Sequence, residues 1–170
     1  MKLFTVLFSL ILSGLLLGAQ TKDDSLEVIR KRVNHINNTK GLVVKVLKDE
    51  EFPEHTPDGG GELKGYFKDG KLVKIAEWIG LSSCTQTTEY YLQDGKLIFI
   101  YLQGKDFDYL TPTKTTKPKL VMECRFYYTN DQLIKSLIHG KTKCSDSPDA
   151  EWAKELRGSF LNYRTLLELK

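Results

Sequence analysis

The chain reads Gly65-Tyr66-Phe67-Lys68-Asp69-Gly70-Lys71-Leu72-Val73 and then repeats this pattern twice. The second copy is Tyr90-Tyr91-Leu92-Gln93-Asp94-Gly95-Lys96-Leu97-Ile98, and the third is Phe126-Tyr127-Tyr128-Thr129-Asn130-Asp131-Gln132-Leu133-Ile134. An Asp-Gly pair between aromatic and apolar runs is a strong signal of a β-hairpin, because glycine tolerates the positive φ of a type I′ turn. Asn130 and Asp131 replace that pair in the third copy, and both residue types tolerate the same conformation. The sequence therefore predicts three hairpins.

A two-residue turn also predicts which side chains share a face of the sheet. It places Phe67 opposite Leu72, and a period of two along each strand extends this core face. The other residues expected there are Tyr90, Leu92, Leu97, Phe99, Met122, Cys124, Phe126, Tyr128, Leu133 and Leu137. The second face is expected to hold Lys64, Tyr66, Glu89, Tyr91, Glu123, Arg125 and Tyr127, with Val73, Ile75, Ile98 and Ile134 between them. Either a helix covers part of it, or Tyr66, Tyr91 and Tyr127 form an open tyrosine row.

Amphipathic helices are predicted on both sides of the hairpins. Apolar residues recur at helical spacing over 25–37, which predicts a first helix. Asp24, followed three residues later by Glu27, matches a capping box at its start. The basic run 30–32 is interpreted as the solvated face of this helix. A β-branched run over 42–47 predicts a first strand. Ser147-Pro148 resembles a helix start, and a second stripe consists of Trp152, Leu156, Phe160, Tyr163 and Leu167. The predicted fold is α+β: an antiparallel meander of about six to seven strands with an N-terminal and a C-terminal helix packed on it.

The N-terminus has the pattern of a secretory signal peptide. Lys2 precedes an apolar run of about 15 residues that ends in small residues near Ala19, whereas a spanning helix needs about 20. We expect a signal peptide over 1–19 and a single exported α+β domain over 20–170, secreted or periplasmic, with no stable membrane span after cleavage. An uncleaved anchor is the alternative.

The three cysteines, Cys84, Cys124 and Cys144, lie in the exported part. In an oxidising compartment, one disulfide and one unpaired thiol is the simplest arrangement, and all three pairings are open.

Several function classes are excluded or disfavoured by what the sequence lacks. A net charge of +3 is too small for a nucleic-acid interface. The chain has no phosphate loop, no Cys-x-x-Cys pair and no nucleophile elbow, so no cofactor and no catalytic residue are predicted. The acidic segment 49–61 contains His55, but its spacing does not match a calcium loop, and no metal site is predicted.

The segment 103–119 is longer than an ordinary hairpin connection. Its part 111–119 is polar and bounded by Pro112 and Pro118, and it contains Lys114, Lys117 and Lys119. Loops longer than about 12 residues in a compact domain are usually functional or disordered, and both interpretations stay open here.

The hairpin units Tyr-x-x-Asp-Gly-Lys-Leu resemble those of uncharacterised exported proteins of Bacteroidetes-type bacteria built from tyrosine-rich hairpins. They are distantly similar to the short hairpin repeats of membrane-occupation-type and antitoxin-like arrays. The resemblance covers Gly61 to Leu137. It implies a hairpin-built sheet and carries no active site.

The leading hypothesis is a non-catalytic exported binding or scaffold protein of the bacterial envelope. Its partner would be an envelope protein or glycan, and the chain would be a monomer or weak dimer. The predicted binding residues are Tyr66, Tyr91, Tyr127, Lys114, Lys117 and Lys119. One alternative is an inhibitor that inserts 103–119 into a secreted enzyme. The other is a hydrolase that uses Glu123 with Arg125, or His139, as acid and base.

Overall fold

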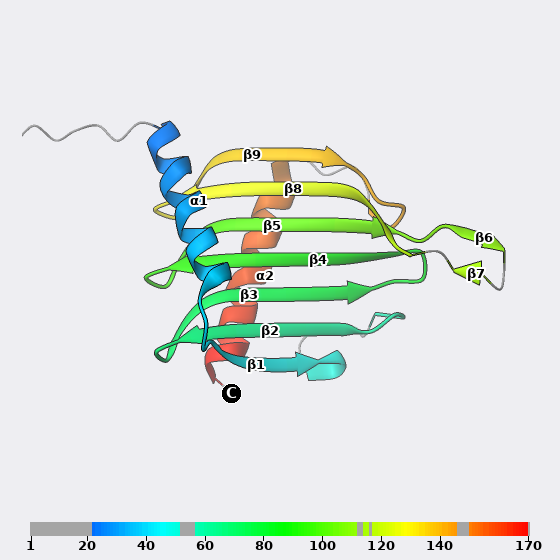
Figure 1. Cartoon of the computed structure of the whole chain (residues 1–170), viewed down its shortest axis with the longest axis horizontal. Helices are drawn as coiled ribbons and strands as arrows, with labels where there is room; N and C mark the ends of the chain where they lie inside the picture. The colour runs from blue at the N-terminus through cyan, green and yellow to red at the C-terminus, as the bar shows by residue number, and fades with distance from the viewer. Residues whose placement is uncertain (1–21, 52–56, 112–113, 116, 146–149, 170) are drawn as a thin grey trace, which may run out of the picture.

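The computed structural model describes residues 22–51, 57–111, 114–115, 117–145 and 150–169. Seven antiparallel strands form one sheet whose order follows the chain (Figure 1). They are β1 (Val43–Lys48), β2 (Gly61–Lys68), β3 (Lys71–Gly80), β4 (Cys84–Gln93), β5 (Lys96–Asp106), β8 (Lys119–Thr129) and β9 (Gln132–Gly140). A short 3-10 helix, η1 (Asp49–Glu51), follows β1.

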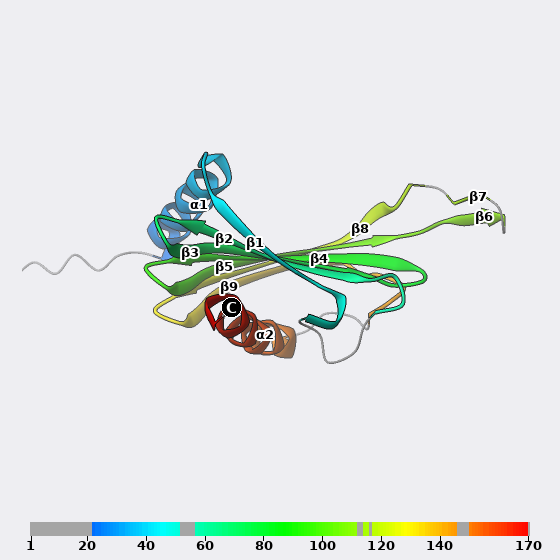
Figure 2. The same ribbon diagram turned by 90° about the horizontal axis from the view of Figure 1, so that it is seen from below.

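Two helices sandwich this sheet. Helix α1 (Lys22–Asn38) crosses one face and helix α2 (Ala150–Leu169) crosses the other (Figure 2). The α+β meander with an N-terminal and a C-terminal helix is therefore confirmed. Asp24 lies inside α1 and not at its start, so the predicted capping box is wrong. The expected helix start at 147–148 and the leader at 1–19 lie outside the described residues.

The three predicted turns are present. Both central residues of each turn have positive φ: 50° and 74° at Asp69 and Gly70, and 51° and 75° at Asp94 and Gly95. The third turn has 50° at Asn130 and 61° at Asp131. This is the type I′ conformation, whose twist matches that of the flanking strands.

Each hairpin also contains a β-bulge two residue pairs beyond its turn. Phe67 lies opposite Leu72, but Tyr66 lies opposite Lys74, so Val73 is an extra residue. In the same way, Leu92 and Tyr91 pair with Leu97 and Phe99, and Tyr128 and Tyr127 pair with Leu133 and Lys135. Ile98 and Ile134 are thus the extra residues of the second and third hairpins. A bulge reverses the alternation of side chains beyond it.

Because of the bulges, some side chains lie on the face of the sheet opposite to the predicted one. Phe99 and Leu137 belong to the layer under α1, and Ile75 belongs to the layer under α2, so these three assignments are wrong. Leu133, expected in the core, is 43% exposed on the edge strand β9. The remaining core-face residues pack under α2 as expected, among them Tyr90, Leu92, Leu97, Met122, Cys124, Phe126 and Tyr128.

The sheet therefore has a buried layer on each side. The predicted stripe of α2 faces the larger layer, with Phe160 and Leu167 buried and Trp152, Leu156 and Tyr163 packed against it. Leu26, Ile29 and Ile36 of α1 cover the smaller layer. No helix in the described part of the chain combines the length and the apolar character needed to cross a membrane.

Candidate functional site

The α1 face of the sheet is best described as rows of side chains that run across the strands. One row consists of Tyr66, Lys74, Tyr91, Phe99, Tyr127 and Lys135. The next consists of Lys64, Ala76, Glu89, Tyr101, Arg125 and Leu137, and the third of Glu62, Trp78, Thr87, Gln103, Glu123 and His139. Helix α1 lies over the end of the sheet that holds the three turns (Figure 1). The third row lies beyond it.

The predicted tyrosine row lies mostly under this helix. Tyr91 is 1% exposed and Tyr127 is 4% exposed, while Tyr66 is half-buried. The alternative in which a helix covers part of the second face is the one found. The rings of Tyr91 and Tyr127 are thus largely covered, and they do not form an open row of stacking surfaces with Tyr66.

Tyr91 joins α1 to the sheet through a polar network. Its hydroxyl lies 2.6 Å from a carboxylate oxygen of Glu89 and 3.1 Å from Oδ1 of Asn37. Lys74 Nζ lies 2.6 Å from Glu89 and 4.9 Å from the centroid of the Tyr91 ring. Burial, together with the hydrogen bond to Glu89, raises the pKa of Tyr91 well above its usual value. These groups satisfy one another, so they stabilise the docking of α1.

Phe99 is the centre of an aromatic cluster under α1. Its ring centroid lies 5.7 Å from that of Tyr91, 4.8 Å from that of Tyr127 and 6.4 Å from that of Tyr101. The rings of Phe99 and Tyr101 are nearly parallel, at 10°. Pairs at these separations stabilise by about 0.5–1.5 kcal/mol beyond the burial of apolar area.

A polar cluster lies beside these rings. Tyr101 donates a hydrogen bond to Glu123 and accepts one from Gln103 at 2.8 Å. The Arg125 guanidinium lies 3.1 Å from Glu123 and 5.0 Å from the centroid of the Tyr101 ring. His139 lies opposite Glu123 on the neighbouring strand.

The structure thus brings together the three residues of the hydrolase hypothesis, Glu123, Arg125 and His139. The hydrogen bond from Tyr101, with the charge of Arg125, lowers the pKa of Glu123 below its usual value. A carboxylate that gives up its proton this readily is a weak general base near neutral pH. The cluster is better suited to holding a polar ligand than to transferring a proton.

Two adjoining hollows lie between α1 and the strands β5 and β8. Their volumes are about 320 Å³ and 270 Å³, and Val33, Phe99 and Arg125 line both. Arg30 and Tyr127 line the first, with the Arg30 guanidinium 5.9 Å from the centroid of the Tyr127 ring. The floor is therefore aromatic, and two arginines flank it.

The segment 103–119 is not one continuous loop. Residues 103–106 continue β5, and Lys119 begins β8. Between them β6 (Tyr109–Thr111) and β7 (Lys114–Thr115) pair antiparallel as a narrow arm that extends beyond the sheet (Figures 1 and 2). Of the three predicted lysines, Lys117 and Lys119 are exposed and Lys114 lies in β7.

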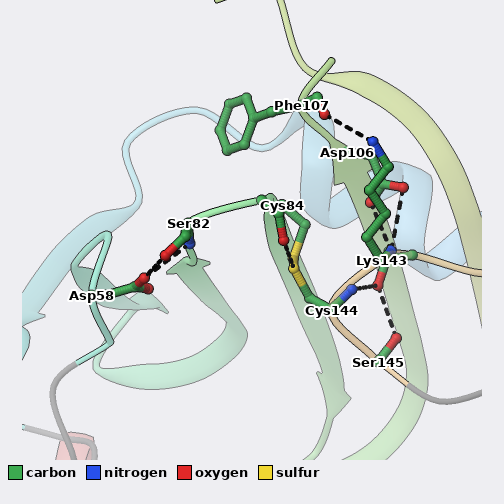
Figure 3. The surroundings of a disulfide bond; sticks show 10 residues. Asp58, Ser82, Cys84, Asp106, Phe107, Lys143, Cys144 and Ser145 are labelled. Atoms are coloured by element: carbon green, nitrogen blue, oxygen red, sulfur yellow. Dashed lines mark hydrogen bonds between the residues drawn. A yellow bond between two sulfur atoms is a disulfide. The ribbon is translucent and has the colours of Figure 1, made fainter. Parts of the chain in front are cut away.

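A disulfide lies at the base of this arm. Cys84, at the start of β4, is joined to Cys144, which follows β9 (Figure 3). Phe107 donates its backbone N–H to Ser83 O at 2.9 Å, and the Asp106 carboxylate accepts the N–H of Lys143 at 3.1 Å. The strand that leads into the arm is thereby held to chain segments on both sides of it.

The third cysteine, Cys124, is a buried free thiol. One disulfide and one free thiol is the expected count. Burial raises the pKa of Cys124 to about 11. A thiol in this state is a poor nucleophile.

Sequence reasoning missed two contributors to the α1 face. Arg30 belongs to the basic run interpreted as a solvated face, and nothing in its sequence context sets it apart from Lys31. Phe99 was assigned to the wrong side of the sheet. The apolar triplet Leu97-Ile98-Phe99 does break strict alternation, and that break was the available sign of a bulge.

The described part of the chain contains no group of three histidine, cysteine or acidic side chains that is able to hold a metal ion. His55 lies outside that part. In comparisons with known proteins, the chain matches no family model, no curated protein and no solved structure.

Proposed function

We propose that the chain is a non-catalytic, exported binding protein of the bacterial envelope. It contacts its partner with the β6–β7 arm and with the third row of side chains, which lies beyond α1. The observation that carries this proposal is the arm itself, which projects from the sheet (Figures 1 and 2) next to the Cys84–Cys144 disulfide (Figure 3). A disulfide of this kind is typical of proteins in oxidising compartments.

The chemistry of this third row and of the arm favours an envelope glycan with acidic groups as the partner. Trp78 is 38% exposed, and it lies opposite Thr87 on the neighbouring strand. An aromatic ring beside hydroxyl and amide groups suits a sugar, because one face of the sugar is apolar and its rim is polar. The exposed cations Lys117 and Lys119 add attraction for negative charge.

The test measures binding of an acidic polysaccharide, polygalacturonate, and of its neutral methyl ester by titration calorimetry. The triple variant Lys114→Gln, Lys117→Gln, Lys119→Gln should lose most of its affinity for the acidic form, and Trp78→Ala should weaken both forms. A matched control replaces three exposed lysines elsewhere, Lys31, Lys68 and Lys154, by glutamine. Equal effects of the two triple variants would contradict a role for the arm.

The same arm favours a second candidate, an inhibitor whose arm inserts into the cleft of a secreted enzyme. Asp106 and Lys119 lie opposite each other, so an Asn-Gly turn in place of 107–118 is expected to close β5 and β8 into an ordinary hairpin. Loss of inhibition in this shortened chain, with the glycan data negative, would support the inhibitor. Trypsin cleavage after Lys114 that leaves the fold intact would count against it.

A further inference from the structure

We infer that the hollow under α1 is a binding site for a small amphipathic anion, an apolar chain or ring that carries one carboxylate. This site is separate from the arm and does not rest on the proposed function. It combines an apolar floor, a volume suited to a small molecule and a positive charge at its rim.

The floor is built from rings that the fold holds rigidly. Phe99 and Tyr127 are buried, and their centroids lie 4.8 Å apart. Ile29 and Val33 of α1 form the opposite wall. The first hollow has a volume of about 320 Å³ and adjoins the second of about 270 Å³. Ligand sites typically measure about 300–1,000 Å³ and are mostly apolar with a few convergent polar groups.

The charges around the hollow leave one cation in excess. Glu89 is neutralised by Lys74 at 2.6 Å, and Glu123 by Arg125 at 3.1 Å. Among the described residues, no carboxylate lies within ion-pair distance of Arg30, and its guanidinium lies 5.9 Å from the centroid of the Tyr127 ring. Arg30 is exposed, so its guanidinium is free to turn toward a bound group. A planar carboxylate matches the fork of guanidinium donors.

The geometry therefore orients the ligand. Its apolar body lies on Phe99 and Tyr127, and its carboxylate accepts hydrogen bonds from Arg30 at the rim. The side-chain amide of Asn34, which also lines this hollow, lies on the same helix one turn further on. A cationic ligand of the same size would meet the Arg30 charge and be rejected.

The test compares three eight-carbon probes, octanoate, 1-octanol and octylammonium, by titration calorimetry with the full chain. Octanoate should bind saturably, octanol about tenfold more weakly, and octylammonium weakest of all. Arg30→Gln should weaken octanoate about tenfold, as expected for the loss of a hydrogen bond to a charged group, and leave octanol unchanged. Lys31→Gln is the matched control, because it removes the same charge from the solvent side of α1, where Lys31 pairs with Glu27 at 2.6 Å.

Three results would overturn the inference. They are no saturable binding of octanoate, equal binding of octanoate and octanol, and equal effects of Arg30→Gln and Lys31→Gln. Both variants change exposed side chains, so circular dichroism should show an unaltered fold. A negative result with these probes would not contradict the proposed role of the arm. That role is tested separately, by binding of the polysaccharide to the lysine variants.

Discussion

Phe99 lies opposite Tyr91 across strands β4 and β5, one residue out of step with the two-residue turn between them. The extra residue is Ile98. Their ring centroids are 5.7 Å apart, and both rings pack under α1. The bulge therefore turns Phe99 to the α1 face, and the aromatic floor of the hollow depends on it.

The chain should still fold when the bulge residue Ile98 is deleted, but not when a regularly paired residue of β5 is deleted. Deleting Ile98 leaves Leu92 opposite Leu97 and Tyr91 opposite Phe99, with regular alternation. We expect a folded chain that loses about 2 kcal/mol, the contribution of one partly buried apolar side chain. Deleting Ile100 instead moves Tyr101 into the α2 layer and reverses every later side chain of β5.

Urea denaturation followed by circular dichroism separates these outcomes. The Ile98 deletion should show a cooperative transition at lower urea, and the Ile100 deletion should show none. Equal loss of structure in both would contradict this account of the bulge.

The third turn should be improved by a single glycine. Asp131 has φ 61°, whereas the equivalent positions hold Gly70 and Gly95. Asp131→Gly removes the cost of a Cβ in the left-handed region, and we expect a gain of about 0.5–1 kcal/mol in the free energy of unfolding. Asp131→Ala should destabilise the chain, because alanine keeps the Cβ and has no side-chain oxygen to compensate. Thermal unfolding of the two variants beside the parent chain checks the opposite signs.

The number of cysteine thiols that react with a maleimide should depend on whether the chain is folded and on whether it is reduced. A maleimide reagent is expected to label no cysteine in the native chain, Cys124 alone after unfolding, and all three after unfolding with reductant, since Cys84 and Cys144 are joined. Mass spectrometry reads the count directly. Two labelled thiols in the native chain would contradict the pairing.

Removing the disulfide should lower stability strongly. Its partners are separated by 60 residues in the sequence. Closing a loop of that length in the unfolded chain corresponds to about 4 kcal/mol in the chain-entropy account. The double variant Cys84→Ser, Cys144→Ser should therefore unfold at much lower urea than the parent chain, whereas Cys124→Ala should lose less.

Stability should fall as the pH rises through the titration of Glu77. This carboxyl lies on the α2 side of β3 and accepts a hydrogen bond from Tyr163. Burial raises the pKa of Glu77 above its usual value of 4.5. The folded chain therefore holds this proton more tightly than the unfolded chain. The contribution of this proton to the free energy of unfolding is complete below pH 4.5. It is lost as the pH rises through the pKa of Glu77 in the folded chain.

Glu77→Gln should flatten this part of the stability profile, measured by urea denaturation at a series of pH values. Tyr163→Phe should steepen it, because the Tyr163 hydrogen bond stabilises the charged carboxylate. Glu155→Gln, an exposed change on α2, is the control. An unchanged slope in Glu77→Gln would assign the pH dependence to other groups.

The sequence alone determined the local features of this fold, which are its turns and the buried face of α2. The pairs Asp69-Gly70 and Asp94-Gly95 predicted two turns, and Asn130-Asp131 predicted the third, because positive φ at two successive residues restricts the choice of amino acid. The apolar stripe of α2 predicted its buried face for a similar reason: a helix has a fixed period. Both features depend on residues that are close together in the chain.

Only the tertiary structure decided which face each side chain occupies after a bulge and how much of a face is covered. Ile98 pairs with no residue on β4. Strict alternation assumes that every residue is paired, so it predicts the wrong layer for Phe99. Arg30 and Phe99 are far apart in the sequence, and they line one hollow only because α1 docks across β5 and β8. The disulfide partner of Cys84 depended in the same way on where β9 ends. Contacts of this kind arise from packing between distant segments, and no local pattern records them.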